Sequence, residues 1–319
     1  MVIGSDDGEG NLRAIKQIMR TVFARLPSVL SRLFTKAFLN ARNLPGVFWA
    51  LRVRFLGRKV IFADKFGFRW WQYPSDPLAQ NWARQSIGDS DGVRSFVLRH
   101  VQREQVCIDV GACYGSISVP LWSRVGENGK VISVEADPAK IFRVRENLSL
   151  NGFSTQHVVN VAISDREESR RLRCYPKAPG WNTFGDPAFA SNYQSFMIDV
   201  QAVSFQRLCQ NEGLTIIDLV KIDAEGAELL ILQGMRPLLE LKSVGCVIFE
   251  VNPLMLPGCG TTPEALLSFW RGLEYKLYHI NPYGNTEPLV QLVWPGGVGD
   301  CVALLDNQAG NNSARMVGC

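Results

Sequence analysis

The residues with the most evident chemistry lie at the end of a short apolar run. This run, Val106–Val110, leads into a loop with two glycines. The pattern is Asp109-x-Gly111-x-x-x-Gly115, and it runs directly into an expected helix. Glycines permit a tight turn and the close approach of a ligand, because they carry no Cβ. The spacing differs from that of the dinucleotide loop, Gly-x-Gly-x-x-Gly. It suits a nucleoside that carries an amino acid, whose ammonium group Asp109 can help to hold; an ordinary glycine-containing turn is the alternative.

A second acidic residue, Glu135, stands twenty residues beyond Gly115, at the end of the next expected strand. In dinucleotide-binding folds an acid at this place binds the ribose, and here it can accept hydrogen bonds from both ribose hydroxyls of an adenosine. The third expected strand leads into Asn160–Asp165, whose backbone and small side chains can border an adenine ring. The predicted cofactor-binding residues are Asp109, Gly111, Ala112, Tyr114, Gly115, Glu135, Ala136, Asp137, Ala162, Ser164 and Asp223.

Four segments of the chain form a recognisable set. They are Asp109-Val-Gly-Ala-x-x-Gly115, Glu135-x-Asp-Pro138, Asn147-x-x-x-Asn151-Gly152 and Val220-Lys-Ile-Asp-Ala-Glu-Gly-Ala-Glu228. Together they resemble the FkbM family of methyltransferases. The resemblance covers about residues 90–280, and the last of the four segments is the most distinctive. It implies a class I methyltransferase fold, S-adenosylmethionine as the methyl donor and, usually, methylation of a hydroxyl oxygen. The acceptors in this family include sugars and polyketide-type natural products.

Three carboxylates at the ends of the later strands are the candidate catalytic residues. Asp223 ends the expected strand Leu219–Asp223, Glu225 lies where the next helix begins, and Glu250 lies near the end of Val247–Val251. Ligands of open α/β sheets bind beyond the carboxyl ends of the strands, so Asp223 is expected to lie opposite the glycine loop and face the methyl group. Methyl transfer to an alcohol requires the acceptor oxygen and the methyl group to be held in line, and it benefits from a base that accepts the hydroxyl proton.

The same acidic residues allow other roles. Glu225 and Glu228 can instead cap the helix and pair with neighbouring basic residues. No metal is expected, although Asp223, Glu250 and Asn252 could alternatively gather a magnesium ion, as in metal-dependent O-methyltransferases.

One segment, residues 169–200, fits the alternation of strands and helices poorly and is interpreted as an insertion rich in Pro, Gly, Trp and Asn. Within it, Trp181 and Asn182 would suit stacking on a sugar or another ring and hydrogen bonding to its hydroxyls. A surface turn with a packed tryptophan is the alternative.

From about residue 92, strand-like apolar runs alternate with amphipathic segments. This predicts an α/β fold, a class I methyltransferase Rossmann-like sheet with helices on both faces. We divide the chain into a basic helical N-terminal extension (1–57), a small β-hairpin with a linker (58–91) and an S-adenosylmethionine-binding domain (92–319). The expected strands are Val106–Val110, Val131–Glu135, Val158–Val161, Leu219–Asp223, Val247–Val251, Tyr275–Ile280 and Val302–Leu305. The expected helices are Ser116–Val125, Pro138–Leu150, Gly226–Leu232 and Pro263–Leu273.

Charge is distributed very unevenly along the 319 residues, although the net charge is only +4. Residues 11–60 contain eleven Lys and Arg residues and no acid, whereas residues 61–319 are net acidic. The apolar residues of 11–40 fall at helical spacing, which predicts two short amphipathic helices. This extension can pack on the catalytic body, contact an anionic membrane through residues 11–60 or, less favourably, bind nucleic acid.

Function and location follow from the same features. The favoured function is methylation of a small-molecule or glycan acceptor, with a nucleic-acid methyltransferase and a non-catalytic cofactor-binding scaffold as alternatives. The eight cysteines form no recognisable pairing or metal pattern, which favours free thiols in a reducing compartment. We therefore expect a cytoplasmic protein, with peripheral contact at a membrane surface as a further expectation.

Overall fold

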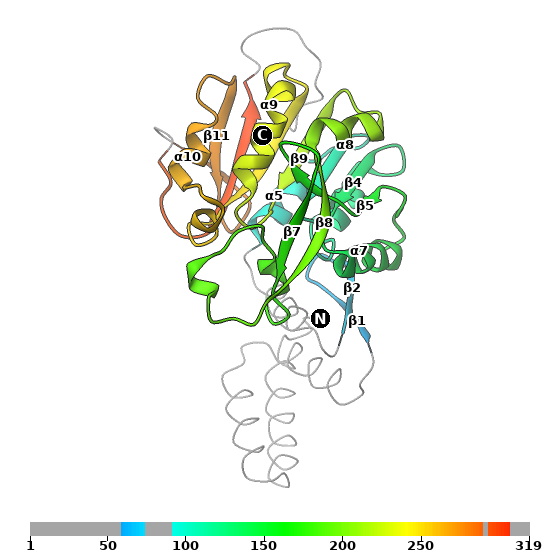
Figure 1. Cartoon of the computed structure of the whole chain (residues 1–319). Helices are drawn as coiled ribbons and strands as arrows, with labels where there is room; N and C mark the ends of the chain where they lie inside the picture. The colour runs from blue at the N-terminus through cyan, green and yellow to red at the C-terminus, as the bar shows by residue number, and fades with distance from the viewer. Residues whose placement is uncertain (1–58, 74–90, 290–292, 307–319) are drawn as a thin grey trace, which may run out of the picture. The chain divides into compact units, whose positions relative to one another are not determined.

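The computed structural model describes residues 59–73, 91–289 and 293–306 (Figure 1). The chain divides into two units, Met1–Arg58 and Lys59–Cys319, and the described residues all belong to the second. The helices expected in residues 11–40 lie outside the described residues.

An eight-stranded sheet forms the centre of the second unit, in the order β12-β11-β13-β10-β9-β3-β4-β5. Strands β10, β9, β3, β4 and β5 pair in parallel, and β13 pairs antiparallel with both β10 and β11. Every residue of β9 is buried, as expected for a parallel strand covered on both faces. The bounds are β3 Val106–Val110, β4 Lys130–Val134, β5 Val158–Val159, β9 Ile217–Ile222, β10 Val244–Val251, β11 Tyr275–Ile280, β12 Thr286–Pro288 and β13 Gly299–Leu305.

Helices cover both faces of this sheet and bury a separate apolar core on each side. One core joins the sheet to α8 (Phe205–Glu212), α9 (Glu228–Glu240) and α10 (Pro263–Ser268). The other joins it to α5 (Gly92–His100), α6 (Ser118–Val125) and α7 (Pro138–Leu150). The predicted class I methyltransferase arrangement, with helices on both faces of the sheet, is therefore confirmed.

The segment 169–200 lies outside the main sheet, as expected for an insertion, but it contains regular strands that the sequence did not indicate. It contains most of β7 (Glu168–Cys174) and the first half of β8 (Phe196–Ser204), two long antiparallel strands that lie in front of the main sheet in Figure 1. With β6 (Ala162–Ser164) they form a second, three-stranded sheet in the order β6-β8-β7. No sequence pattern indicated β7, because its run Glu-Ser-Arg-Arg-Leu-Arg-Cys is mostly charged and only two of its seven residues are buried.

Several expected elements have other ends in the structure, and the helix expected at Pro263–Leu273 ends at Ser268. Two further differences have a visible reason. The strand expected at Val158–Val161 is split, because the chain leaves the main sheet after Val159 and joins the second sheet at Ala162. The helix expected to end at Leu232 continues to Glu240. Gly234 does not break that helix; a Cβ there would lie 2.7 Å from the carbonyl oxygen of Ser164, so the glycine permits close packing on β6.

The predicted hairpin forms from β1 (Val60–Ala63) and β2 (Arg69–Gln72), and α7 holds it in place. The side-chain oxygens of Asn147 and Asn151 accept hydrogen bonds from the backbone N–H groups of Trp71 and Arg69, at 3.0 and 2.9 Å. These two asparagines belong to one of the family-like segments, and in the structure they dock an edge strand.

Two further features concern the described part of the chain. No helix there is both long and apolar enough to cross a membrane. The cysteines there are all free.

Candidate active site

The glycine loop between β3 and α6 lies directly against the end of β9. Gly111 has a φ of +78°, and a Cβ at this position would lie 1.8 Å from the carbonyl oxygen of Asp223. The N–H groups of Gly111 and Ala112 both donate to the carbonyl oxygen of Val134, each at 3.0 Å. Glycine is therefore required here for two reasons, its backbone conformation and the contact between two strand ends.

Glu135 follows β4 and is held by the backbone on either side of it. Its carboxylate oxygens accept hydrogen bonds from the N–H groups of Cys113 and Asp137, each at 2.8 Å, and its side chain is 5% exposed. Burial raises the pKa of Glu135, while the Lys140 ammonium and these two hydrogen bonds act in the opposite direction. The two bonds fix the orientation of the carboxylate and leave lone pairs for further donors.

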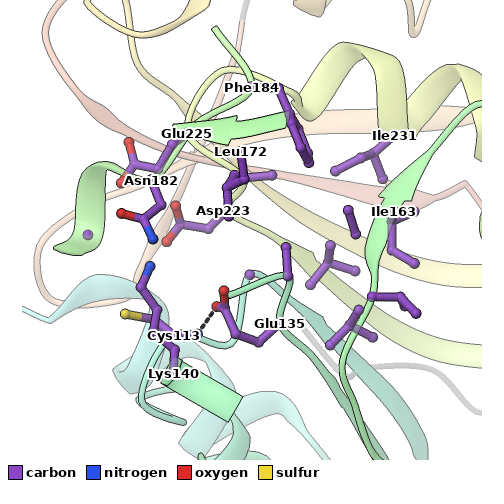
Figure 2. A pocket seen from close by; sticks show the side chains of 18 of the residues that line it. Cys113, Glu135, Lys140, Ile163, Leu172, Asn182, Phe184, Asp223, Glu225 and Ile231 are labelled. Carbon is purple, nitrogen blue, oxygen red and sulfur yellow. Dashed lines mark hydrogen bonds between the residues drawn. The ribbon is translucent and has the colours of Figure 1, made fainter. Parts of the chain in front are cut away.

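A pocket opens between the glycine loop, Glu135 and the second sheet, and its two ends differ in polarity (Figure 2). The apolar end includes Ile163, Phe184 and Ile231, and the polar end includes Lys140 and Asn182. Such a pocket fits a nucleoside that carries a charged chain. The pocket is lined by Val110, Gly111, Cys113, Ser116, Val134, Glu135, Ala136, Lys140, Val161, Ala162, Ile163, Leu172, Gly180, Asn182, Phe184, Asp223, Ala224, Glu225 and Ile231.

The connection between β7 and β8 closes one side of this pocket. Thr183 is buried, and its hydroxyl donates to the carbonyl oxygen of Glu225 at 2.7 Å. Asn182 donates to the carboxylate of Asp137 at 2.9 Å. The segment interpreted as an insertion is thus bonded to the turns that follow β9 and β4.

Three carboxylates meet beside the pocket, as the sequence predicted for the strand ends. Asp223, Glu225 and Glu250 each place an oxygen within 4.8 Å of the others. Burial, followed by the charge of Asp223, raises the pKa of Glu225 and of Glu250 well above the ordinary range. One oxygen of Glu225 is buried and accepts no hydrogen bond from the described residues. A set of oxygens this close can share a proton or a cation.

Lys221 is the cation that faces Asp223. Its ammonium donates to the Asp223 carboxylate at 3.0 Å and lies 3.8 Å from Oδ1 of Asp109. Burial alone would lower the pKa of Lys221, but the charges of Asp223 and Asp109 outweigh it and raise the pKa. Lys221 thus links the base of the glycine loop to the candidate catalytic carboxylate.

Glu228 caps the turn before α9. It accepts hydrogen bonds from the N–H groups of Ala224 and Gly226, at 2.8 and 3.0 Å, and its side chain is fully buried. Burial raises its pKa to about 7. The capping role that the sequence allowed for Glu228 is therefore the one seen, and its bonds hold a turn in which Glu225 adopts a left-handed φ of +50°.

The structure separates the predicted site residues into two groups. Those that line the pocket are Gly111, Glu135, Ala136, Ala162, Asp223 and Glu225. Those that do not line it are Asp109, Ala112, Tyr114, Gly115, Asp137, Ser164 and Glu250. Glu250 nevertheless belongs to the carboxylate group, and Asp137 caps α7 by accepting from the N–H of Ala139.

The role expected for Asp109 requires a correction. Its carboxylate is 1% exposed and accepts a hydrogen bond from the Ser118 hydroxyl at 2.6 Å. Its other oxygen faces the ammonium of Lys221. Asp109 was expected to face the ammonium of a bound nucleoside, but in the structure it faces that of a lysine side chain. Asp109 belongs to β3, before the turn, and its side chain is bonded to α6 through Ser118 instead of lining the pocket.

Three other predicted residues also serve the structure. Ala112 and Ser164 are buried, and the ring of Tyr114 stacks with the Arg143 guanidinium at 4.4 Å. Asn252 donates to Glu250 and accepts from the N–H of Leu254, so both polar atoms of its side chain already have partners.

The aromatic residue proposed for acceptor binding is surrounded by other rings. Trp181 makes edge-on contacts with Tyr175, Phe189 and Tyr193, at centroid distances of 6.3, 5.1 and 5.1 Å. Asn182 is bonded to Asp137 and to the backbone N–H of Tyr175. Both residues therefore have structural partners, and Asn182 also lines the pocket.

Sequence reasoning missed several residues of the pocket. Leu172 and Phe184 come from the second sheet and its connection, where no pattern indicated a ligand. Lys140 had a signal that was overlooked: it stands in the first turn of α7, where a positive charge is unfavourable to the helix dipole. A lysine at that position suggests a role other than helix stability.

Comparisons with known proteins agree with the motif residues. Residues 109–277, more than half of the chain, match the model of the methyltransferase FkbM domain. Comparison with curated proteins found no match.

Similar solved structures include several methyltransferases. An FkbM methyltransferase from Methylobacillus flagellatus is 13% identical, with 82% of this chain and 59% of that chain covered and a TM-score of 0.40. An O-methyltransferase from Bacillus cereus in complex with SAH is 14% identical, with coverages of 71% and 88% and a TM-score of 0.37. Precorrin-6y C5,15-methyltransferase from Geobacter metallireducens is 16% identical, with coverages of 67% and 86% and a TM-score of 0.36.

The match of the family model includes the glycine loop, Glu135 and the Lys221–Glu228 segment, which are the parts that shape the pocket. The chain therefore belongs to the FkbM methyltransferase family and is an S-adenosylmethionine-dependent methyltransferase.

Proposed function

We propose that the protein methylates a hydroxyl oxygen of a sugar, a glycolipid or a natural-product acceptor. The observation that carries this proposal is the group of Asp223, Glu225 and Glu250 beside the polar end of the cofactor pocket. A hydroxyl becomes more acidic as its oxygen forms a bond to carbon, so a nearby carboxylate assists the reaction. Carboxylates at the acceptor side support O-methylation.

In this mechanism S-adenosylmethionine supplies the methyl group as an electrophilic carbon on its sulfonium. Glu135 would accept hydrogen bonds from its ribose hydroxyls, and the apolar end around Ile163, Phe184 and Ile231 would enclose its adenine. Asp223 would accept the proton that the acceptor hydroxyl loses as its oxygen takes up the methyl group. Lys221 holds the Asp223 carboxylate in position through its 3.0 Å hydrogen bond.

Glu225 and Glu250 are the alternative bases. Their raised pKa means that they retain protons to higher pH than ordinary glutamates, so each can donate a hydrogen bond to the acceptor as well as accept one. If Asp223→Asn retains full activity, the base is one of these two residues, or positioning alone accounts for the rate.

The acid character of the site disfavours a nucleic-acid acceptor. Asp300 pairs with Glu250 across β13 and β10, and burial, followed by the charge of Asp223, raises its pKa to about 7. Any of these carboxyl groups that is ionised would repel an approaching phosphate group. RNA methylation with a steep dependence on salt would contradict this argument.

A direct test is an unbiased search for the acceptor. Cell extracts would be incubated with the enzyme and S-adenosylmethionine, and products carrying one added methyl group would be sought by mass spectrometry, with Asp223→Asn as the matched control. An enzyme that binds the cofactor but never yields S-adenosylhomocysteine would instead be a scaffold. Methylation that is lost in EDTA and restored by Mg²⁺ would show that the three carboxylates act through a metal.

We also propose that residues 11–60 bind an anionic membrane surface and present the site to a lipid-linked or surface-bound acceptor. The proposal rests on eleven basic residues without an acid and on the helical spacing of apolar residues. Charge reversal in the full chain (Arg13→Glu, Lys16→Glu and Arg20→Glu together) should reduce co-sedimentation with phosphatidylserine vesicles at low salt. Equal co-sedimentation of both proteins would make the extension a packing element or a dimer arm.

A further inference from the structure

Lys140 is a buried cation that points into the cofactor pocket. Its side chain is 6% exposed, and Figure 2 shows it reaching from the first turn of α7 into the polar end beside Cys113. Among the described residues its ammonium makes neither a hydrogen bond nor an ion pair within 4 Å. By contrast, Lys221, which is also buried, is bonded to Asp223.

The position of Lys140 leaves its ammonium without a hydrogen-bond acceptor among the described residues. It lies at the N-terminal end of a helix, where the dipole repels a positive charge, and burial removes the water that would solvate it. Burial by itself would lower the pKa of Lys140, but neighbouring groups, including Glu135 and Asp137, outweigh this effect and raise the pKa. The side chain therefore stays charged and carries donors that no described residue accepts.

The order of groups along the pocket indicates which part of the cofactor reaches Lys140. The apolar end around Ile163 and Ile231 suits the adenine ring, and Glu135 stands between this end and Lys140 (Figure 2). With the ribose at Glu135, the methionine chain extends over the glycine loop toward the polar end. The α-carboxylate is the anionic group of S-adenosylmethionine, and an ammonium is its natural partner.

We propose that Lys140 binds the α-carboxylate of the methionine part of S-adenosylmethionine and thereby selects for the intact amino-acid chain. This inference rests on S-adenosylmethionine being the cofactor, and it does not depend on which atom of the acceptor is methylated. Lys140 is then a binding residue with no part in proton transfer.

Two ligands that differ only in the α-carboxylate can test whether Lys140 binds this group. Isothermal titration would compare S-adenosylhomocysteine with its decarboxylated analogue, on the wild-type protein and on Lys140→Met. Methionine keeps the apolar stem and removes the charge, so binding of S-adenosylhomocysteine should weaken by about 10–100-fold, the effect of losing a hydrogen bond to a charged group. The analogue should bind both proteins with affinities within about 3-fold of each other, because it has no carboxylate to lose.

Lys140→Arg, which keeps the charge, should restore part of the affinity for S-adenosylhomocysteine. Lys177→Met, at an exposed lysine, should leave both affinities unchanged. An equal loss for the two ligands in Lys140→Met would overturn the proposal and assign Lys140 to the ribose or to Glu135. Unchanged affinity for S-adenosylhomocysteine would also overturn it.

The wild-type protein alone gives a second test that does not depend on the folding of a variant. The proposal requires the decarboxylated analogue to bind wild-type protein about 10-fold or more weakly than S-adenosylhomocysteine does. Equal binding would show that the carboxylate has no partner here. Binding of both ligands would in either case confirm the cofactor class, so failure of this inference leaves the proposed function standing.

Discussion

Two acidic regions lie at the same edge of the sheet: Glu135 forms one, and the group of Asp223, Glu225 and Glu250 forms the other. They differ in how their carboxylates are hydrogen-bonded. Both oxygens of Glu135 accept backbone N–H groups from adjacent turns. In the other group, the carboxylates crowd within 4.8 Å of one another, and an oxygen of Glu225 has no hydrogen-bond donor among the described residues. A satisfied carboxylate is fixed in advance for binding, whereas a crowded one retains the capacity to exchange a proton.

The largest expected effect of a substitution is on turnover, at Asp223. Asp223→Asn keeps the shape and removes the charge, so turnover should fall by about 100–10,000-fold, the usual contribution of a general base. Affinity for S-adenosylhomocysteine should change little, because Glu135 and the apolar end are untouched. Kinetics with an identified acceptor and titration of the product would measure the two effects, with the exposed Asp186→Asn as the control. Equal losses in both would place Asp223 in cofactor binding instead.

Gly111 lies between the two regions, since it contacts both the end of β4 and the end of β9. A substitution at Gly111 tests this packing without changing any of the carboxylates. Gly111→Ala would place a methyl group 1.8 Å from the carbonyl oxygen of Asp223 at a φ of +78°. We expect a loss of about 2–5 kcal/mol in the free energy of unfolding, from strain and overpacking together. Gly152→Ala is the matched control, with a φ of +79° and no atom within 4 Å, and it should cost about 1 kcal/mol. Similar losses in the two variants would show that the strand ends can separate without penalty.

Replacement of Glu135 tests whether this carboxylate binds the cofactor. Glu135→Ala removes the acceptor for the ribose hydroxyls and for the N–H groups of Cys113 and Asp137, so affinity for S-adenosylhomocysteine should fall by about 1–3 kcal/mol. NAD and NADP should show no measurable binding to either protein in isothermal titration. The exposed Glu127→Ala should bind like wild type. Unchanged affinity in Glu135→Ala would remove the ribose assignment.

The smallest effect concerns stability against pH. Glu228 is buried with a pKa raised to about 7, so the native state holds a proton that the unfolded chain releases near pH 4.5. Its contribution to stability is complete below the unfolded pKa and is lost as pH rises through the folded one, by about 1–2 kcal/mol between pH 5 and 7. Thermal unfolding of wild type and Glu228→Gln across this range would show the difference, because glutamine does not ionise. Parallel pH profiles would contradict the buried-acid explanation.

Sequence patterns were sufficient where the chemistry is local to a strand and the turn after it. The buried runs of β3, β4 and β9 were recognisable because parallel strands covered on both faces are continuously apolar. Gly111 and Glu135 stand at fixed distances from those runs, so their place at the pocket could be predicted. The three carboxylates could also be predicted as neighbours, because the ends of β9 and β10 meet at one edge of the sheet.

The tertiary structure decided everything that depends on which surface a side chain faces. Asp109 and Lys221 pair with each other across β3 and β9, and this removes Asp109 from the pocket although its position in the motif suggested contact. Leu172 and Phe184 reach the apolar end only because β7 and β8 fold over the main sheet. Lys140 was visible as an odd charge at a helix start, but its burial in the pocket depends on contacts between segments far apart in the chain. A sequence records the order of residues along a strand or helix, whereas burial and pairing are set by the packing of these elements.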